Sequence, residues 1–347
     1  MIVTYYDRNF ISLSDSSSLN VESYTIKRQA VDFDDFTFTS ESFTADFNPT
    51  FVTLKDNRGR YKYGAFAGIP EIDSDNKTNC QCSDLKTLFN NDVLLQFSSY
   101  TYLTDMLSYG FTQFANQVVQ SSFELEIDMT DISDIELGDL VPSTELSVYS
   151  FWSDVLVPYM KYYDCYMESK LDVANKKIIY YIKKINKKVL PLKVWELGLK
   201  NIGKWVASTN EAQAVVSVSG SLTYGDKYIL LSDNTITTDE NLRDLYPIKR
   251  KVVLSETDDA TELSDLLQDA NVEALTELVN ARYNESIQIS TNKLPYLEDI
   301  DFGTSFSVYT ERGVFYKQLP LGIIEENETE EKILTIGYKA DDIVFYI

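Results

Sequence analysis

The spacing of apolar residues changes from helical to strand-like near the end of the chain, which limits the folds open to it. Between residues 258 and 283 apolar side chains recur every three or four positions. They are Leu263, Leu266, Leu267, Ala270, Ala274, Leu275, Leu278 and Val279. This spacing predicts an amphipathic helix with one apolar stripe. The segments SIQIS, TSFSVYT, VFYKQLPLGII and EKILTIGY follow with a period of two, which indicates strands. We expect Leu266 and Leu275 to be buried against them.

The rest of the chain divides into an alternating first part and a mixed middle. Residues 1–88 read as short strands, with a turn at Asp56–Gly59. Residues 89–251 mix helical and strand-like patterns and include hairpins at 165–185 and 212–232. The predicted class is therefore α+β and β-rich. We expect a small antiparallel β-barrel in 1–88, a mixed α/β region, and a helix with a second β-barrel in 252–347.

The charge balance restricts the classes of partner. The chain has 31 basic and 54 acidic residues in 347, and its formal net charge is −23. Such a field repels nucleic acid and anionic membranes from most of the surface. The chain has no histidine, so the usual general base and the commonest metal ligand are missing. We expect no catalytic residues, no cofactor and no metal.

The cysteines and the apolar runs indicate a protein made in a cytosol. Cys80 and Cys82 are two residues apart on one predicted strand, an awkward geometry for a mutual disulfide. With Cys165 they form an odd set, and we expect all three thiols to be reduced. The N-terminus lacks the pattern of a signal peptide, and no apolar run reaches the ~18 residues of a membrane helix. We expect no membrane insertion.

Two short patterns resemble catalytic motifs. In FELEIDM, Glu124, Glu126 and Asp128 alternate with apolar residues, so the carboxylates share one strand face. Paired carboxylates hydrolyse glycosides, but a solvated strand face has the same pattern and is the favoured interpretation. Ser83–Lys86 matches S-x-x-K, and we interpret it as a chance match because its companion motifs are absent.

Lysines are concentrated in one predicted hairpin and its exit. Residues 175–195 contain no acidic residue. The candidate interface lysines there are Lys176, Lys177, Lys183, Lys184, Lys187 and Lys188. Two interpretations stay open: lysines that protect an edge strand from aggregation, or a docking surface for an acidic partner, including another copy of the chain. DNA binding is a third, less favoured one because of the net charge.

Three stretches carry a family resemblance. They are residues 59–95, beginning GRYKYGAFAGIPEID, residues 300–338, beginning IDFGTSFSVYT, and FWSDVLVPYMKYYDCYM before the strand KKIIYYIKKI. Together they resemble the baseplate hub proteins of long-tailed phages of Gram-positive bacteria. These proteins are related to the hub of contractile tails, and their enzyme-bearing members are called tail-associated lysins. The likeness covers most of the chain in order, at the level of pattern.

The resemblance implies a specific assembly. It implies a homotrimer in which two β-barrel domains per chain form a ring of pseudo-sixfold symmetry. The ring would cap the tail tube at the distal tail protein, and it would contact receptor-binding or tape-measure proteins. DNA would pass through without specific binding. The expected location is the virion tail tip, after synthesis in the cytoplasm of the host bacterium. No lysin segment follows the second predicted barrel, so we expect no enzymatic activity.

Three functions follow from these observations. The first is a structural hub at the tip of a phage or prophage tail. The second is a module that binds saccharide of the host cell wall, because the chain is rich in aromatic residues. The third is a carboxylate-dependent wall hydrolase. For a hub, an acidic channel would keep DNA moving. We therefore expect Glu124, Glu126 and Asp128 to line the channel and the lysines of residues 176–193 to face away from it.

Overall fold

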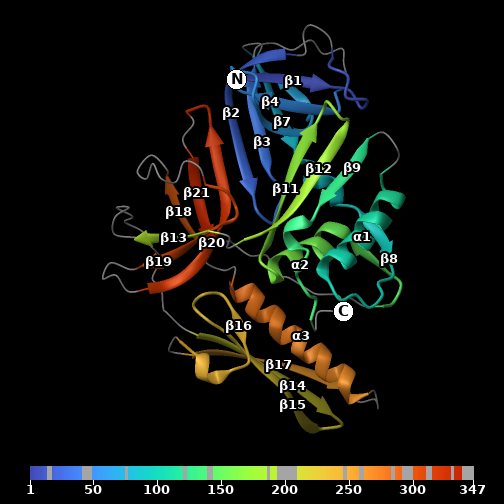
Figure 1. Ribbon diagram of the computed structural model, residues 1–347, viewed down its shortest axis with the longest axis vertical. Helices are drawn as coiled ribbons and strands as arrows, with labels where there is room; N and C mark the ends of the chain where they lie inside the picture. The colour runs from blue at the N-terminus through green and yellow to red at the C-terminus, as the bar shows by residue number, and fades with distance from the viewer. Residues whose placement is uncertain are drawn as a thin grey trace.

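The computed structural model describes most of the chain (Figure 1). The described residues are 1–13, 18–40, 49–74, 77–119, 123–138, 144–185, 188–193, 209–244, 248–257, 262–282, 286–290, 300–309, 315–329 and 332–337. The structure consists mainly of strands with three α-helices among these residues, which confirms a β-rich α+β class. Within the same segments, no helix combines the length and the apolar character needed to cross a membrane.

The elements alternate as follows. The first part contains β1 (Ile2–Tyr6), β2 (Ser18–Gln29), β3 (Asp35–Ser40), β4 (Phe51–Lys55), β5 (Tyr61–Phe66), β6 (Pro70–Ile72), β7 (Thr78–Ser83), the 3-10 helix η1 (Leu85–Phe89) and β8 (Asp92–Leu95). The middle contains α1 (Leu103–Gln117), β9 (Glu124–Asp128), η2 (Thr130–Ile132), β10 (Ser147–Ser150), the π-helix η3 (Phe151–Leu156), α2 (Val157–Tyr162), β11 (Cys165–Asp172), β12 (Lys177–Lys184) and β13 (Lys188–Lys193). The last part contains β14 (Thr209–Val218), β15 (Ser221–Leu230), β16 (Ile236–Thr237), η5 (Glu240–Leu242), β17 (Ile248–Thr257), α3 (Leu263–Arg282), β18 (Ser286–Ser290), β19 (Thr304–Tyr309), β20 (Phe315–Asn327) and β21 (Lys332–Gly337).

One large sheet joins the first and last parts of the chain. Its main path among the described strands is β1-β4-β5-β7-β3-β2-β20-β19-β13. The central junction is the antiparallel pairing of β2 with β20, from Thr25↔Asn327 to Gln29↔Ile323. β1 pairs with both β4 and β2, so the first six strands of this path pair in a closed circuit. Its weakest link is the single pair Phe66↔Ser83 between β5 and β7. The two separate β-barrels expected from the sequence stay a prediction.

Strict alternation in β3 and β7 builds the first core. Phe36 and Phe38 on β3 and Cys80 and Cys82 on β7 point inward and are buried, whereas the residues between them are largely exposed. The cysteine Sγ atoms are 3.7 Å apart and not bonded, and Cys165 is also a free thiol. The prediction that Cys80 and Cys82 share one strand face is therefore confirmed.

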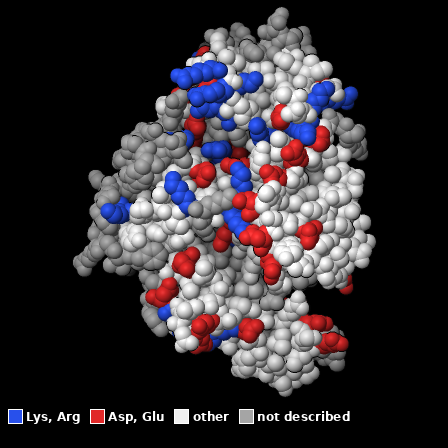
Figure 2. All heavy atoms as spheres, viewed as in Figure 1, with Lys and Arg blue, Asp and Glu red and all other residues white. Residues whose placement is uncertain are grey.

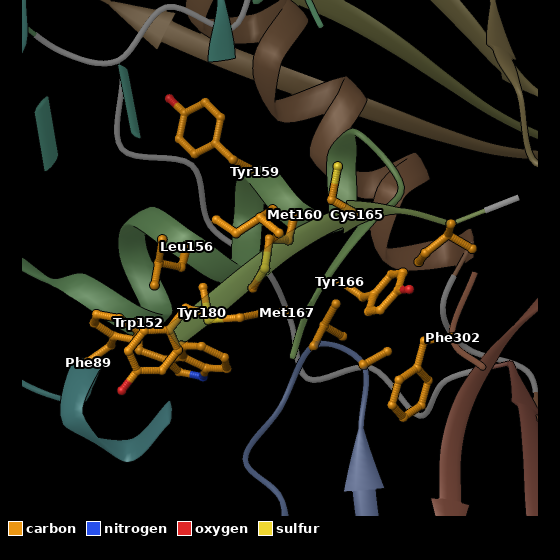
Figure 3. Packing of buried hydrophobic residues seen from close by; sticks show 14 of the residues in the cluster. Phe89, Trp152, Leu156, Tyr159, Met160, Cys165, Tyr166, Met167, Tyr180 and Phe302 are labelled. Carbon is orange, nitrogen blue, oxygen red and sulfur yellow. The ribbon is translucent and has the colours of Figure 1, made fainter. Parts of the chain in front are cut away.

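The main core gathers aromatic side chains from many elements (Figure 3). Phe89 packs against Tyr180 of β12, with ring centroids 4.5 Å apart. Gly110 lies within α1, and a Cβ at this position would lie 3.1 Å from the ring of Phe151. The glycine therefore allows helix and ring to approach closely. Pro158 is the second residue of α2, directly after the π-helix, where proline is tolerated.

The helix α3 packs differently from the prediction. It lies along one face of the four-stranded sheet β16-β15-β14-β17, which precedes it in the chain (Figure 1). Ala270 and Ala274 are fully buried there, while Leu266 is only half-buried. Val272 and Val279 contribute to the main core, so the helix has two buried faces. The expectation that the stripe packs against the following strands is wrong for Leu266, because small residues bring α3 close to the earlier sheet.

Candidate functional site

The lysine-rich strand β12 is not an edge. It is the central strand of β11-β12-β9, antiparallel to β11 and parallel to β9. The interpretation that the lysines of β12 protect an exposed edge is therefore wrong. β13, which begins with Lys188, pairs only with β19 among the described strands, so that interpretation stays open there. Lys176 lies in the turn before β12 with a φ of 58°, and Lys187 lies outside the described residues.

The parallel pairing brings the two predicted residue sets together. Lys177 is in register with Glu124. Its Nζ is 3.1 Å from Glu124 Oε1 and 3.2 Å from Glu126 Oε2. The hydrogen bond from Lys177 to Glu124 is the main cause that raises the pKa of Lys177, and the hydrogen bond to Glu126 is the second cause. The predicted separation of lysines and carboxylates therefore does not hold at Lys177. That the carboxylates border a channel stays a prediction.

The third carboxylate of that strand ends β9. Asp128 Oδ1 accepts a hydrogen bond from the backbone N–H of Thr130, 3.0 Å away, at the start of η2. This bond is the largest cause that lowers the pKa of Asp128. Asp128 therefore fixes the turn after β9 and leaves Glu124 and Glu126 as the carboxylates paired with the lysine strand.

The remaining lysines of β12 pair with acidic residues from neighbouring elements. Lys183 Nζ is 2.7 Å from Glu168 Oε2 on β11, and Lys184 Nζ is 2.6 Å from Asp134 Oδ1 after η2. The bond from Lys184 lowers the pKa of Asp134. These pairs are part-exposed, and each contributes little to stability. The strand thus presents mixed charge with its lysines already neutralised.

Lys86, Asp34 and Asp84 form a buried ionic cluster that the sequence did not predict. Lys86 Nζ, with its side chain 1% exposed, is 2.7 Å from Asp34 Oδ1 and 3.3 Å from Asp84 Oδ2. It also donates to the carbonyl oxygens of Gln29 (2.9 Å) and Asp32 (2.6 Å). The ammonium therefore ties the β2–β3 turn to η1. The sequence contains these residues in SDLK, where Ser83 is exposed and Asp84 caps η1, so the S-x-x-K match is structural.

The protonation of this cluster follows from its burial. Burial is the main cause that raises the pKa of Asp84 to about 6, and the negative charge of Asp34 is the second cause. Burial lowers the pKa of Lys86, but the two carboxylates outweigh it, so its pKa is raised. Tyr63 donates its hydroxyl to Asp34 Oδ2 at 3.0 Å. The lysine is held as an ammonium ion with its donors satisfied, so it is not poised to act as a nucleophile.

A polar groove lies over β2, β3 and β7. Its volume is about 870 Å³. The outward side chains of β3 and β7 that line it are Asp35, Thr37, Thr39, Asn79, Gln81 and Ser83. The Thr39 hydroxyl donates to Asn79 Oδ1 at 2.7 Å. Within the described segments, no group of three or more Cys, Asp and Glu side chains is placed to hold a metal ion. The outward side chains that line the groove can donate and accept hydrogen bonds.

The charges on the face shown in Figure 2 are unevenly distributed. Lys and Arg side chains gather in its upper half, while Asp and Glu predominate over the lower half, around α3 and its sheet. The two signs are interleaved at the centre of the face. This pattern suits contacts with other proteins better than a polyanion groove.

A solved structure shares this fold. A prophage tail protein, gp18 from Listeria monocytogenes, superimposes with a TM-score of 0.50 at 9% identity, covering 98% of this chain and 96% of that one. The chain has the fold of a prophage tail protein. A 43 kDa tail protein of prophage MuSo2 from Shewanella oneidensis has a TM-score of 0.49 at 12% identity, covering 97% of this chain and 98% of that one. A tail protein from Neisseria meningitidis also has a TM-score of 0.49, at 9% identity, covering 97% of this chain and 95% of that one. No protein-family model and no curated protein sequence matches the chain.

Proposed function

We propose that this protein is a structural component at the tip of a phage or prophage tail, where it forms a trimeric ring as a baseplate hub. The observation that carries the proposal is the likeness to the Listeria tail protein, which extends over 98% of this chain. A likeness over the whole length favours a role of the entire fold. The ring would cap the tail tube and bind the distal tail protein, and the chain would have no enzymatic activity of its own.

Two features of the chain support an assembly role. The first and last parts are joined into one sheet by β2 and β20, which makes a stiff frame. Large apolar side chains also stand exposed on two smaller sheets, at levels that favour protein contacts. The two β-barrels that the ring requires are a part of this proposal, and the closed circuit of pairings around β1 is consistent with the first.

The test is the mass of the protein in solution and its place in a particle. Light scattering should give three times the 39.7 kDa of one chain, alone or on addition of the distal tail protein. Electron micrographs of tails labelled with an antibody to this protein should show label at the tip. A monomer at every concentration, with no affinity for the distal tail protein, would count against the proposal.

A second candidate rests on the polar groove. Its hydroxyl and amide side chains could form hydrogen bonds with a saccharide of the host cell wall. The isolated protein should then bind purified wall saccharide, and Gln81→Ala with Thr37→Ala should weaken binding. Full binding by this double variant, or none by the wild type, would remove this candidate.

The hydrolase hypothesis is weakened because the carboxylates of Glu124 and Glu126 are ion-paired with Lys177. Zymography of the wild type and of Glu126→Gln on wall material tests this hypothesis.

A further inference from the structure

The sheet under α3 has an exposed apolar face on its other side. Val215 of β14 is in register with Tyr224 of β15 and with Leu254 of β17, so the three side chains form a row across the sheet. Val215 is buried, but Tyr224 is 63% and Leu254 is 48% exposed. Leu222 (58%) and Val252 (52%) flank the row. We call Leu222, Tyr224, Val252 and Leu254 the β15–β17 face.

A second apolar face belongs to the two-stranded sheet of β8 and β10. Leu94 and Val148 are cross-strand partners, and both are exposed, by 47% and 69%. Leu146, just before β10, is 60% exposed. We call Leu94, Leu146 and Val148 the β8–β10 face. The opposite side of this sheet is covered, because Val93, Leu95 and Tyr149 are buried in the main core. Within the part of the chain that the structure describes, these three large apolar side chains remain largely exposed to solvent.

The rims of the two faces differ in charge. Residues 87–160, which contain β8 and β10, include no Lys or Arg. Asp92 and Glu145 are exposed beside the β8–β10 face. Near the start of β17, Arg250 lies on the side of the sheet that carries the β15–β17 face, whereas Lys249 and Lys251 lie on the side of α3, where Lys251 pairs with Glu277. Glu256 lies at the far end of that strand. Arg250 and Arg243 share the single carboxylate of Glu211, and the surplus positive charge beside the β15–β17 face complements the acidic residues beside the other face.

The backbone edges are also unequal. In β8, the side-chain amide of Gln117 accepts from Leu94 N at 2.9 Å and donates to Leu94 O at 3.0 Å, which closes that strand edge. Among the described strands, β17 pairs only with β14, so its other edge offers open N–H and C=O groups. An open edge of ten residues beside an apolar face is a ready docking site for a protein.

We propose that the β15–β17 face of one copy of this chain binds the β8–β10 face of the next copy. The two faces lie on different sheets at separate places in the molecule (Figure 1), so the contact is head-to-tail. A contact of this type, repeated around an axis, closes into a ring, whereas a face that binds itself gives only a pair. The inference rests on the proposed self-assembly and names the surfaces that make it.

Cross-linking between single-cysteine variants tests the pairing of faces. Cys80, Cys82 and Cys165 are buried, so we expect the native thiols not to react with the cross-linker. Val148→Cys and Leu254→Cys are prepared separately and treated with a short bis-maleimide, alone and mixed. We expect a covalent dimer only in the mixture. Ile69→Cys, 89% exposed and outside both faces, is the matched control and should not cross-link with either.

Each result has a defined meaning. Dimers formed by either variant alone would show that a face binds itself and would overturn the proposal. The absence of dimers in the mixture, while light scattering shows an oligomer, would overturn the assigned surfaces and leave the ring intact. A wild type that is monomeric by light scattering would remove the ring and the pairing together.

A charge exchange provides an independent test. Asp92→Lys and Arg250→Glu should each weaken self-association about tenfold, measured by sedimentation; in the second variant Glu211 keeps its ion pair with Arg243. The two changes in one chain should restore it, because the acidic and basic rims have exchanged places. Ile69→Ser should leave association unchanged. A double variant that associates no better than the two single variants would contradict the charge pairing.

Discussion

At the residue scale, the buried ionic cluster around Lys86 is where we expect a single substitution to change stability most. A buried ammonium with two carboxylates is costly to form, but removing one partner leaves the others uncompensated. Lys86 also bonds two backbone carbonyls of the β2–β3 turn, so it acts as a cross-brace between that turn and η1. Asp34 and Lys86 are 52 positions apart in the sequence, and no local pattern marks them as partners.

Lys86→Met should cost about 3–5 kcal/mol of unfolding free energy, because it leaves Asp34 and Asp84 buried without a cation. Urea denaturation at pH 7 measures it. Lys170→Met, at an exposed position of β11, is the control and should change stability by less than about 0.5 kcal/mol. Equal losses in the two variants would mean that the cluster is not a brace.

The raised pKa of Asp84 predicts a pH dependence of definite sign. The folded protein binds a proton at Asp84 up to about pH 6, whereas the unfolded chain releases it near 3.8, so the contribution of this group to stability falls as pH rises from 4 to 7. The stability of the wild type minus that of Asp84→Asn should therefore decrease over this range. For Asp134, whose pKa is lowered from its ordinary value of 3.8, the corresponding difference should increase as pH rises up to and past 3.8. A change of the same sign for both would refute the assignment.

At the element scale, local patterns predicted most strands and helices, but not their partners. The turn at Asp56–Gly59 and the hairpin of β14 and β15 are confirmed, since turn residues and alternation are local signals. The parallel pairings β9–β12, β13–β19 and β14–β17 join segments far apart in the sequence. No periodicity encodes a partner, so the ion pairs of Lys177 could not be predicted. The sequence predicted the helix α3, but it did not predict that α3 packs against the sheet that precedes it in the chain.

The packing of α3 predicts which of two leucine substitutions in this helix costs more stability. Leu278 is 2% exposed and lies in the core between α3 and its sheet, so Leu278→Ala should cost about 2–5 kcal/mol. Leu266 is half-buried, and Leu266→Ala should cost clearly less. Thermal or urea unfolding of both variants measures the difference. A larger loss for Leu266→Ala would mean that the first turns of α3 are the buried ones.

Close packing also explains a glycine of β15. A Cβ on Gly225 would lie 2.7 Å from Asn271 Oδ1 and 3.0 Å from the Cβ of Ala214. Gly225→Ala should therefore push α3 from the sheet and destabilise the protein by about 1–3 kcal/mol. Hydrogen exchange would show loss of protection in α3 and β15. Unchanged protection in both elements would contradict this contact.

At the scale of the whole molecule, the pairing of β2 with β20 holds the structure together. It joins the first and last parts of the chain, and Tyr24 and Lys62 both bond Glu326 across the junction. Amide exchange should show equal protection for residues 25–29 and 323–327, because neither strand can open without breaking the shared ladder. The sheet under α3 can open separately and should exchange first. Unequal protection of the two strands would mean that the large sheet is two independent units.

The same pairing has a consequence for protein synthesis. Tyr24 leaves the ribosome 302 residues before Glu326, its bonding partner. At roughly 5–20 residues per second, the β2 edge waits on the order of 15–60 s for β20. During that time its free N–H and C=O groups can pair with strands of other nascent chains. Overproduction at high temperature should therefore favour inclusion bodies, and slower translation or added chaperones should increase the yield of folded protein.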